Sequence, residues 1–129
     1  MKILVVDDEQ VIRDLLTQLL HMKGHEVALG VSGQEAVSKA QAEAFDLIFM
    51  DIMMPDMDGV EALKQIRRQS SSAIVVMMTG FAVEEKIREA MAEGAFEFLY
   101  KPFNIMEVTV ILDKLLKRKG LKPVESKNK

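Results

Sequence analysis

Five polar residues stand directly after short apolar runs in this chain of 129 residues. Asp7 and Asp8 follow one run, Asp51 a second, Thr79 a third and Lys101 a fourth. Carboxylate oxygens are ligands for hard divalent cations, and a carboxylate can also act as a nucleophile. A hydroxyl and an ammonium group can stabilise negative charge on a phosphoryl group. These residue types indicate metal-assisted phosphoryl chemistry, provided that the fold brings them together.

The elements that must position these residues are visible as apolar runs that alternate with segments of helical periodicity. The expected strands cover residues 3–6, 27–29, 47–50, 74–78 and 96–100. The first, third and fourth are continuously apolar, as strands buried on both faces of a parallel sheet must be. The expected buried face of the first helix consists of Val11, Leu15, Leu16, Leu19 and Leu20. Connections of about two to six residues fit an α/β fold with right-handed crossovers.

Turn and capping residues separate these elements. Ser32 followed three residues later by Glu35 predicts a capping box at the start of the second helix. Asn104 is expected to cap the last helix. Asp56 and Asp58, in the loop before the third helix, are interpreted as turn and N-cap residues without a chemical role.

Ligands of open parallel α/β sheets bind outside the carboxyl ends of the strands, so the polar residues that end these runs should meet at one edge. Two carboxylates about 4 Å apart repel by roughly 4 kcal/mol at an effective dielectric near 20. Asp7, Asp8 and Asp51 therefore need a cation or must take up protons. Mg²⁺ is the preferred candidate, because it binds one or two carboxylates and shares its other positions with a phosphate. Asp51 is then the predicted nucleophile, with Thr79 and Lys101 as the groups that neutralise the phosphoryl oxygens.

The composition limits other classes of function. The absence of cysteine excludes disulfides and thiolate metal sites, and neither His21 nor His25 ends a strand, which disfavours zinc. No apolar run approaches the roughly 18 residues that would span a bilayer. We therefore expect a cytoplasmic protein without a membrane segment.

Positive charge is concentrated at the end of the chain. From Lys114 to Lys129 there are seven Lys or Arg residues against one Glu. The preferred interpretation is a helix C-terminus favoured by cations, followed by a solvated tail. Nucleic-acid binding is the weaker alternative, because no basic face with interleaved aromatic residues supports it. The expected organisation is one domain over residues 1–119 and a basic tail or linker over 120–129.

Four motifs resemble those of the receiver domain of bacterial two-component response regulators. They are VVDDE at 5–9, DIMMPDMDG at 51–59, TG at 79–80 and KPF at 101–103. They stand in the family's order, and the resemblance covers residues 1 to about 118. The resemblance implies a doubly wound, flavodoxin-like (βα)5 domain whose five-stranded parallel sheet has the strand order 2-1-3-4-5.

The resemblance also implies roles for individual residues. Asp51 would accept the phosphoryl group, while Asp8 and Asp51 would bind Mg²⁺ directly, Asp7 through water and Met53 through its backbone carbonyl. Thr79 and Lys101 would contact the phosphoryl oxygens. The aromatic residue that changes rotamer in the family corresponds to Phe98, which lacks a hydroxyl. The expected readout surface comprises the fourth helix, the fifth strand and the fifth helix.

Met53 and Phe81 are large and apolar where many members of the family place polar groups. We hypothesise that they shield the acyl phosphate and slow its hydrolysis.

The expected partners are a sensor histidine kinase or a histidine phosphotransfer protein, and a downstream effector. The chain is expected to be a monomer or a weak phosphorylation-dependent dimer that does not bind nucleic acid directly, and not an enzyme acting on a diffusible substrate. Two alternatives remain: an aspartyl-phosphate phosphatase of the haloacid dehalogenase type, and a pseudo-receiver that only binds. The phosphatase family favours a second aspartate where this chain has Met53.

Overall fold

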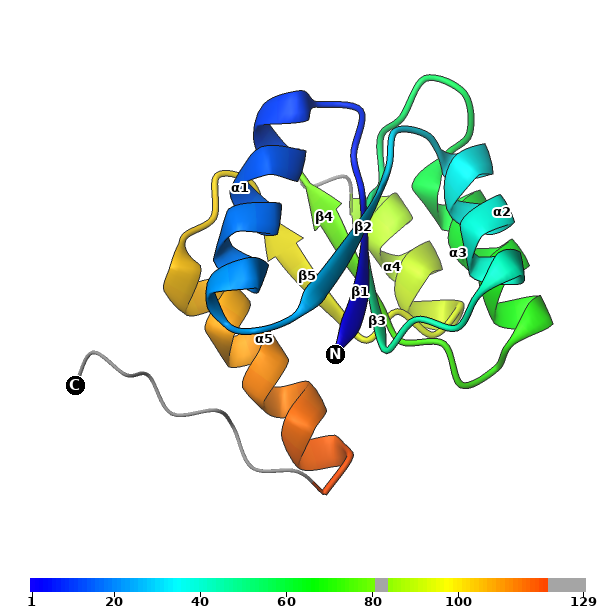
Figure 1. Cartoon of the computed structure of the whole chain (residues 1–129). Helices are drawn as coiled ribbons and strands as arrows, with labels where there is room; N and C mark the ends of the chain where they lie inside the picture. Colours follow the sequence, from blue (N-terminus) through cyan, green and yellow to red (C-terminus); the bar gives the residue numbers. More distant parts are fainter. Residues whose placement is uncertain (81–83, 121–129) are drawn as a thin grey trace.

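The structure is a computed structural model that describes residues 1–80 and 84–120. Its elements alternate between strand and helix (Figure 1). In chain order they are β1 (Lys2–Val6), α1 (Gln10–Met22), β2 (Glu26–Gly30), α2 (Gly33–Ala42), β3 (Leu47–Asp51), α3 (Gly59–Gln69), β4 (Val75–Thr79), α4 (Glu84–Ala92), β5 (Glu97–Tyr100) and α5 (Ile105–Arg118). Phe81 and most of the predicted tail, residues 121–129, lie outside the described residues.

The strands form one parallel sheet in the order β2-β1-β3-β4-β5, which confirms the predicted topology. Helices α1 and α5 cover one face and α2, α3 and α4 cover the other (Figure 1). Because the central strands are covered on both faces, β3 and β4 are buried along their whole length. This explains why their sequences are continuously apolar rather than alternating.

Side chains from alternate positions of the strands supply the two apolar layers. Leu4, Met50 and Met77 face α2, α3 and α4. Ile3, Phe49 and Met78 face α1 and α5. The methionines of the strands, Met50, Met77 and Met78, are thus core residues.

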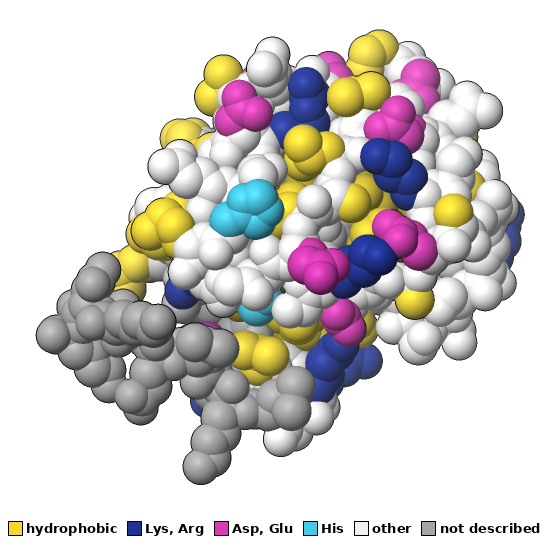
Figure 2. Space-filling view, viewed as in Figure 1, with side chains coloured by type: hydrophobic (Ala, Val, Ile, Leu, Met, Phe, Trp, Pro, Cys, Tyr) yellow, Lys and Arg dark blue, Asp and Glu magenta, His cyan; other side chains and the backbone are white. Residues whose placement is uncertain are grey.

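The predicted buried face of α1 was too wide. Leu16 and Leu20 are fully buried, but Val11 is 75% exposed and Leu15 is 37% exposed. The physical reason is the helix geometry, which places Val11 roughly 140° around the axis from Leu16. Exposed apolar side chains interrupt the charged surface on the face shown in Figure 2.

The predicted N-cap residues cap their helices, but the capping box of α2 is only half formed, because the Glu35 carboxylate accepts from the Val31 N–H instead of the Ser32 N–H. The Ser32 side chain accepts a hydrogen bond from the Glu35 backbone N–H, Asp58 from Val60, and Asn104 from Glu107. These bonds satisfy backbone donors that have no partner inside the first turn of a helix.

Candidate functional site

The carboxyl ends of β1 and β3 bring the strand-end acids together, as the topology requires. One carboxylate oxygen from each of Asp7, Asp8, Glu9 and Asp51 lies within 4.8 Å of the others. Asp7 and Asp51 are buried, whereas Asp8 and Glu9 are exposed. The cluster therefore has a buried base and an open mouth.

The Lys101 ammonium enters this cluster from the end of β5. Its Nζ lies 2.6 Å from Asp7 Oδ2, 3.1 Å from Asp51 Oδ2 and 3.3 Å from Glu9 Oε1. The lysine side chain is 11% exposed, so the head group does not point into bulk water. It supplies one positive charge among four acids, and the repulsion expected from the sequence is only partly relieved.

Hydrogen bonds fix the base of the site. Asp7 Oδ1 accepts from the Glu9 backbone N–H at 2.9 Å, and Asp51 Oδ1 accepts from the Met53 N–H at 3.2 Å. The Arg13 guanidinium donates to the Asp7 carbonyl at 2.7 Å. Asp7 Oδ2 is buried without a hydrogen-bond partner among the described residues, so its contact with Lys101 is an ion pair.

The pKa values of both Asp51 and Lys101 are raised within the cluster. Burial and the negative charge of Asp7 raise the pKa of Asp51 to about 6, although Lys101 acts in the opposite direction. Burial alone would lower the pKa of Lys101, but its close contact with Asp7 and the negative charge of Asp51 raise it instead. Lys101 is therefore charged at neutral pH, and a further cation in the cluster would favour the ionised form of Asp51.

The donor set fits a divalent hard cation. All candidate ligands are carboxylate oxygens, one of which has no hydrogen-bond partner among the described residues. Mg²⁺ prefers such oxygens and retains water at its open positions. Asp8, which is exposed, gives solvent access to the cluster.

Thr79 and Phe98 lie on the adjacent strands β4 and β5. Thr79 is 1% exposed at the end of β4, and its carbonyl accepts from the Lys101 N–H at 2.8 Å. The partly buried ring of Phe98 packs against the apolar layer under α2, α3 and α4. Met53 is 53% exposed, so it lies at the mouth of the site rather than in the core.

Two acidic residues near the site have contacts that the sequence did not predict. Glu9 occupies the N-cap position of α1 without a side-chain capping bond, and its carboxylate contacts Lys101 instead. Asp56 accepts from the backbone N–H groups of Gly33 and Gln34, and so caps α2 from a distant loop. For Glu9, the only sequence signal was its place in the DDE triplet. The contacts of Asp56 had no local signal, because its partners lie more than 20 residues away in the chain.

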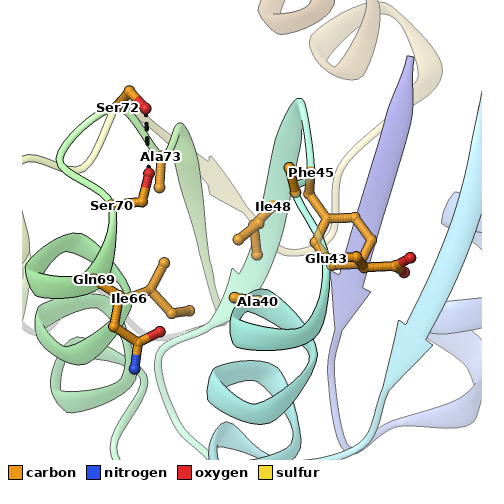
Figure 3. Close-up of a pocket in the computed structure, with 10 residues that line it drawn as sticks. Ala40, Glu43, Phe45, Ile48, Ile66, Gln69, Ser70, Ser72 and Ala73 are labelled. Atoms are coloured by element: carbon orange, nitrogen blue, oxygen red, sulfur yellow. Dashed lines mark hydrogen bonds between the residues drawn. The ribbon is translucent and has the colours of Figure 1, made fainter.

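A cavity of about 120 Å³ lies at the opposite end of the sheet (Figure 3). Phe45, Ile48 and Ile66 line its apolar part, and a hydrogen bond joins Ser70 to Ser72 at its rim. Neither the acids nor Lys101 line this cavity. The candidate site is therefore the acidic cluster.

Comparisons with known proteins agree on one family. The family model of the response regulator receiver domain matches residues 3–113. The chain is 35% identical to the regulatory protein AtoC of Escherichia coli over 94% of its own length and 26% of that protein. It is 37% identical to the alkaline phosphatase synthesis transcriptional regulatory protein PhoP of Bacillus subtilis over 99% of its own length and 53% of that protein. The chain thus spans a quarter to a half of the length of these relatives.

Solved structures give the same result. A CheY-like response regulator receiver domain protein from Methanospirillum hungatei superposes with a TM-score of 0.87 at 32% identity, covering 92% of this chain and 96% of the other. The response regulator protein TrrA of Thermotoga maritima, solved in complex with Mg²⁺-BeF, gives a TM-score of 0.81 at 35% identity, covering 89% and 98%.

Proposed function

Since the chain belongs to the response regulator receiver domain family of two-component systems, we propose that it is a phosphorylation-controlled signalling switch whose phosphoacceptor is Asp51. The observation that carries this proposal is the position of Asp51 Oδ2, 3.1 Å from the Lys101 ammonium in a cluster of carboxylates. A nucleophilic carboxylate needs its charge balanced while it approaches an anionic donor. The Lys101 ammonium supplies part of that balance, and a divalent cation held by the acids beside Asp51 would supply the rest.

In the proposed reaction an Asp51 oxygen attacks phosphorus and forms a new O–P bond. The N–P bond to the imidazole of a histidine kinase or histidine phosphotransfer protein breaks, and that imidazole keeps the electron pair. Lys101 and Thr79 then contact the phosphoryl oxygens and stabilise their charge. Asp7, Asp8, Asp51 and the Met53 carbonyl would hold Mg²⁺, which supplies positive charge to the phosphoryl group. The domain thus assists its own phosphorylation and dephosphorylation and turns over no diffusible substrate.

We infer the output from the positions of Thr79 and Phe98 on the adjacent strands β4 and β5. When Thr79 is drawn toward a phosphoryl group, space opens beside it that Phe98 can fill, and the resting position of α4 is disfavoured. This is a population shift between two states whose size depends on the differential affinity of the phosphoryl group. The exposed side chains of Met91, Tyr100 and Met106 lie on α4, β5 and α5, the surface that we assign to a downstream effector.

The proposal also covers the domain bounds, the cellular location and the oligomeric state of the protein. In the part of the chain that the structure describes, no helix has the length and apolarity needed to cross a bilayer. We assign the receiver domain to residues 1–119 and the protein to the cytoplasm, as a monomer or a weak phosphorylation-dependent dimer. Direct nucleic-acid contacts are not assigned to this segment.

The test is incubation with acetyl phosphate and Mg²⁺, followed by intact mass spectrometry. One phosphoryl adduct is expected, absent in Asp51→Asn and after chelation of the metal with EDTA. Asp14→Asn, a charge-matched control on the exposed side of α1, should form the adduct like the parent. No adduct in the parent would reject the switch, and multiple turnover of a phosphomonoester would indicate the phosphatase.

A further inference from the structure

Glu9 is the one exposed carboxylate among the three that contact the Lys101 ammonium in the described structure. Its Oε1 lies 3.3 Å from Nζ, and its side chain is 60% exposed. Asp7 and Asp51, the other two partners, have side-chain exposures of 0% and 6%. Lysine has three N–H donors, so all three carboxylates can share one ammonium.

The backbone of Glu9 is held so that its side chain reaches this position. The Asp7 carboxylate accepts from the Glu9 N–H, and the Glu9 carbonyl accepts from the Arg13 N–H as α1 begins. The Glu9 side chain makes no capping bond to α1. Its carboxylate is therefore available to Lys101, which lies 92 residues later in the chain.

The two buried partners are also the groups that the proposed function commits elsewhere. Asp7 and Asp51 belong to the expected cation site, and Asp51 loses its negative oxygen when it is phosphorylated. The same cation repels the ammonium that now lies between these acids. Among the described contacts of Lys101, Glu9 is then the carboxylate that remains.

We propose that Glu9 is a positioning residue for Lys101, which keeps the ammonium at the mouth of the acidic cluster when Asp7 and Asp51 are engaged by a divalent cation. This inference rests on the proposed function. Lys101 has a flexible four-carbon stem, and an ammonium without a nearby carboxylate is strongly hydrated. The Glu9 carboxylate restricts it to the place where an incoming phosphoryl group must arrive, so less of its freedom is lost during transfer.

Two other roles for Glu9 make different predictions. Its oxygen is within 4.8 Å of the other acid oxygens, so it could bind the cation directly. Alternatively, it could be a solvated acid whose contact with Lys101 has no consequence. A direct ligand acts on metal affinity, a positioning residue on the rate at saturating metal, and a solvated acid on neither.

The experiment compares Glu9→Gln, Glu9→Asp and the control Asp14→Asn with the parent. The apparent Mg²⁺ Kd is measured by NMR titration, and the rate of adduct formation from acetyl phosphate is measured at saturating Mg²⁺. For Glu9→Gln we expect a rate loss of roughly three- to tenfold, with the Mg²⁺ Kd changed by no more than about threefold. Glu9→Asp keeps the charge on a shorter stem and should fall between Gln and the parent.

A second readout follows the lysine itself. The Cε–Hε NMR signal of Lys101, assigned by its loss in Lys101→Arg, is compared with and without Mg²⁺ but without phosphodonor. In the parent the signal should stay distinct from those of solvated lysines when Mg²⁺ is added. In Glu9→Gln it should move to the position of solvated lysines. Without Mg²⁺ it should stay distinct in both proteins, because Asp7 and Asp51 then hold the ammonium.

The results distinguish a failure of the proposed function from a failure of the role proposed for Glu9. A parent that forms no adduct rejects the proposed function itself. A parent that reacts while Glu9→Gln reacts equally fast at saturating Mg²⁺ overturns only the role of Glu9. A tenfold weaker Mg²⁺ affinity, with the rate restored at saturating metal, also overturns it, because Glu9 would then be a metal ligand. Circular dichroism of each variant verifies folding, and Glu9→Asp provides a second measurement if Glu9→Gln does not fold.

Discussion

Lys86 of α4 and Asp58, the residue that caps α3, form an ion pair with 2.5 Å between Nζ and Oδ2. The other oxygen of Asp58 accepts from the Val60 N–H, so one carboxylate both begins α3 and joins it to α4. A second ion pair joins the same two helices, because Glu89 Oε1 of α4 lies 3.1 Å from Lys64 Nζ of α3. Helix α4 has only Ala90 fully inside the core, so polar contacts to α3 form much of its attachment.

The double role of Asp58 can be separated with two substitutions. Asp58→Ala should lower the free energy of unfolding by about 1 kcal/mol or more, because it removes the cap of α3. Asp58→Asn should retain the cap and lose only the ion pair. Lys86→Met should resemble Asp58→Asn in urea unfolding, and both should speed amide exchange in α4 more than elsewhere. Equal losses for Asp58→Ala and Asp58→Asn would contradict the capping role.

The raised pKa of Asp51 predicts a pH-dependent stability in the absence of metal. The pKa of this carboxyl is about 6 in the folded state against an ordinary value of 3.8, so the folded protein binds more protons than the unfolded chain between these values. Stability contributed by this group is therefore present at low pH and lost as the pH rises through about 6. Asp51→Asn should stabilise the metal-free protein by on the order of 1–3 kcal/mol at pH 7 and much less near pH 4.

Thermal unfolding with EDTA between pH 4 and pH 8 measures this difference. Added Mg²⁺ should raise the Tm of the parent more than that of Asp51→Asn, since a ligand that binds only the folded state stabilises it. A variant that is less stable than the parent at pH 7 would contradict the electrostatic explanation.

Gly59 is expected to be intolerant of any side chain. A Cβ atom there would lie 2.2 Å from the Asp51 carbonyl oxygen and 2.8 Å from the Ile52 Cα. Both are backbone atoms, and the Gly59 N–H donates to the Ile52 carbonyl, so neither side can move away cheaply. Gly59→Ala should cost at least about 2 kcal/mol in urea unfolding. Gly80→Ala, where a Cβ meets nothing within 4 Å, is the matched control and should cost much less.

Substitutions of the exposed Met53 test the hypothesis that its side chain shields the acyl phosphate from water. Its sulfur-containing chain lies at the mouth of the site, next to the backbone that bonds Asp51. Met53→Asn should accelerate loss of the phosphoryl group by several-fold, because a polar group admits and orients water. The loss is followed by intact mass after donor removal. Met53→Leu, equally apolar, should keep the parent rate, and a slower loss in Met53→Asn would contradict the hypothesis.

The sequence alone was sufficient for the fold and for the expectation that most of the candidate site residues lie at one edge of the sheet. Apolar runs of strand length and helical periodicity are local properties, and four of the five expected apolar runs are followed directly by a candidate site residue. Because parallel strands end at a common edge, Asp7, Asp51 and Lys101 could be expected to meet there before any distance was known. Capping residues such as Ser32 were likewise predictable, since a cap and its backbone donor lie within one turn.

The tertiary structure decided what depends on contacts between distant segments. The exposure of Val11 follows from how α1 is rotated against the sheet, and the capping of α2 by Asp56 follows from how two loops approach. The placement of the Lys101 ammonium between Asp7, Asp51 and Glu9 depends on a flexible side chain that reaches across three strand ends. Periodicity and spacing determine which residues share an edge, but packing and charge balance over the whole chain select the side-chain partners.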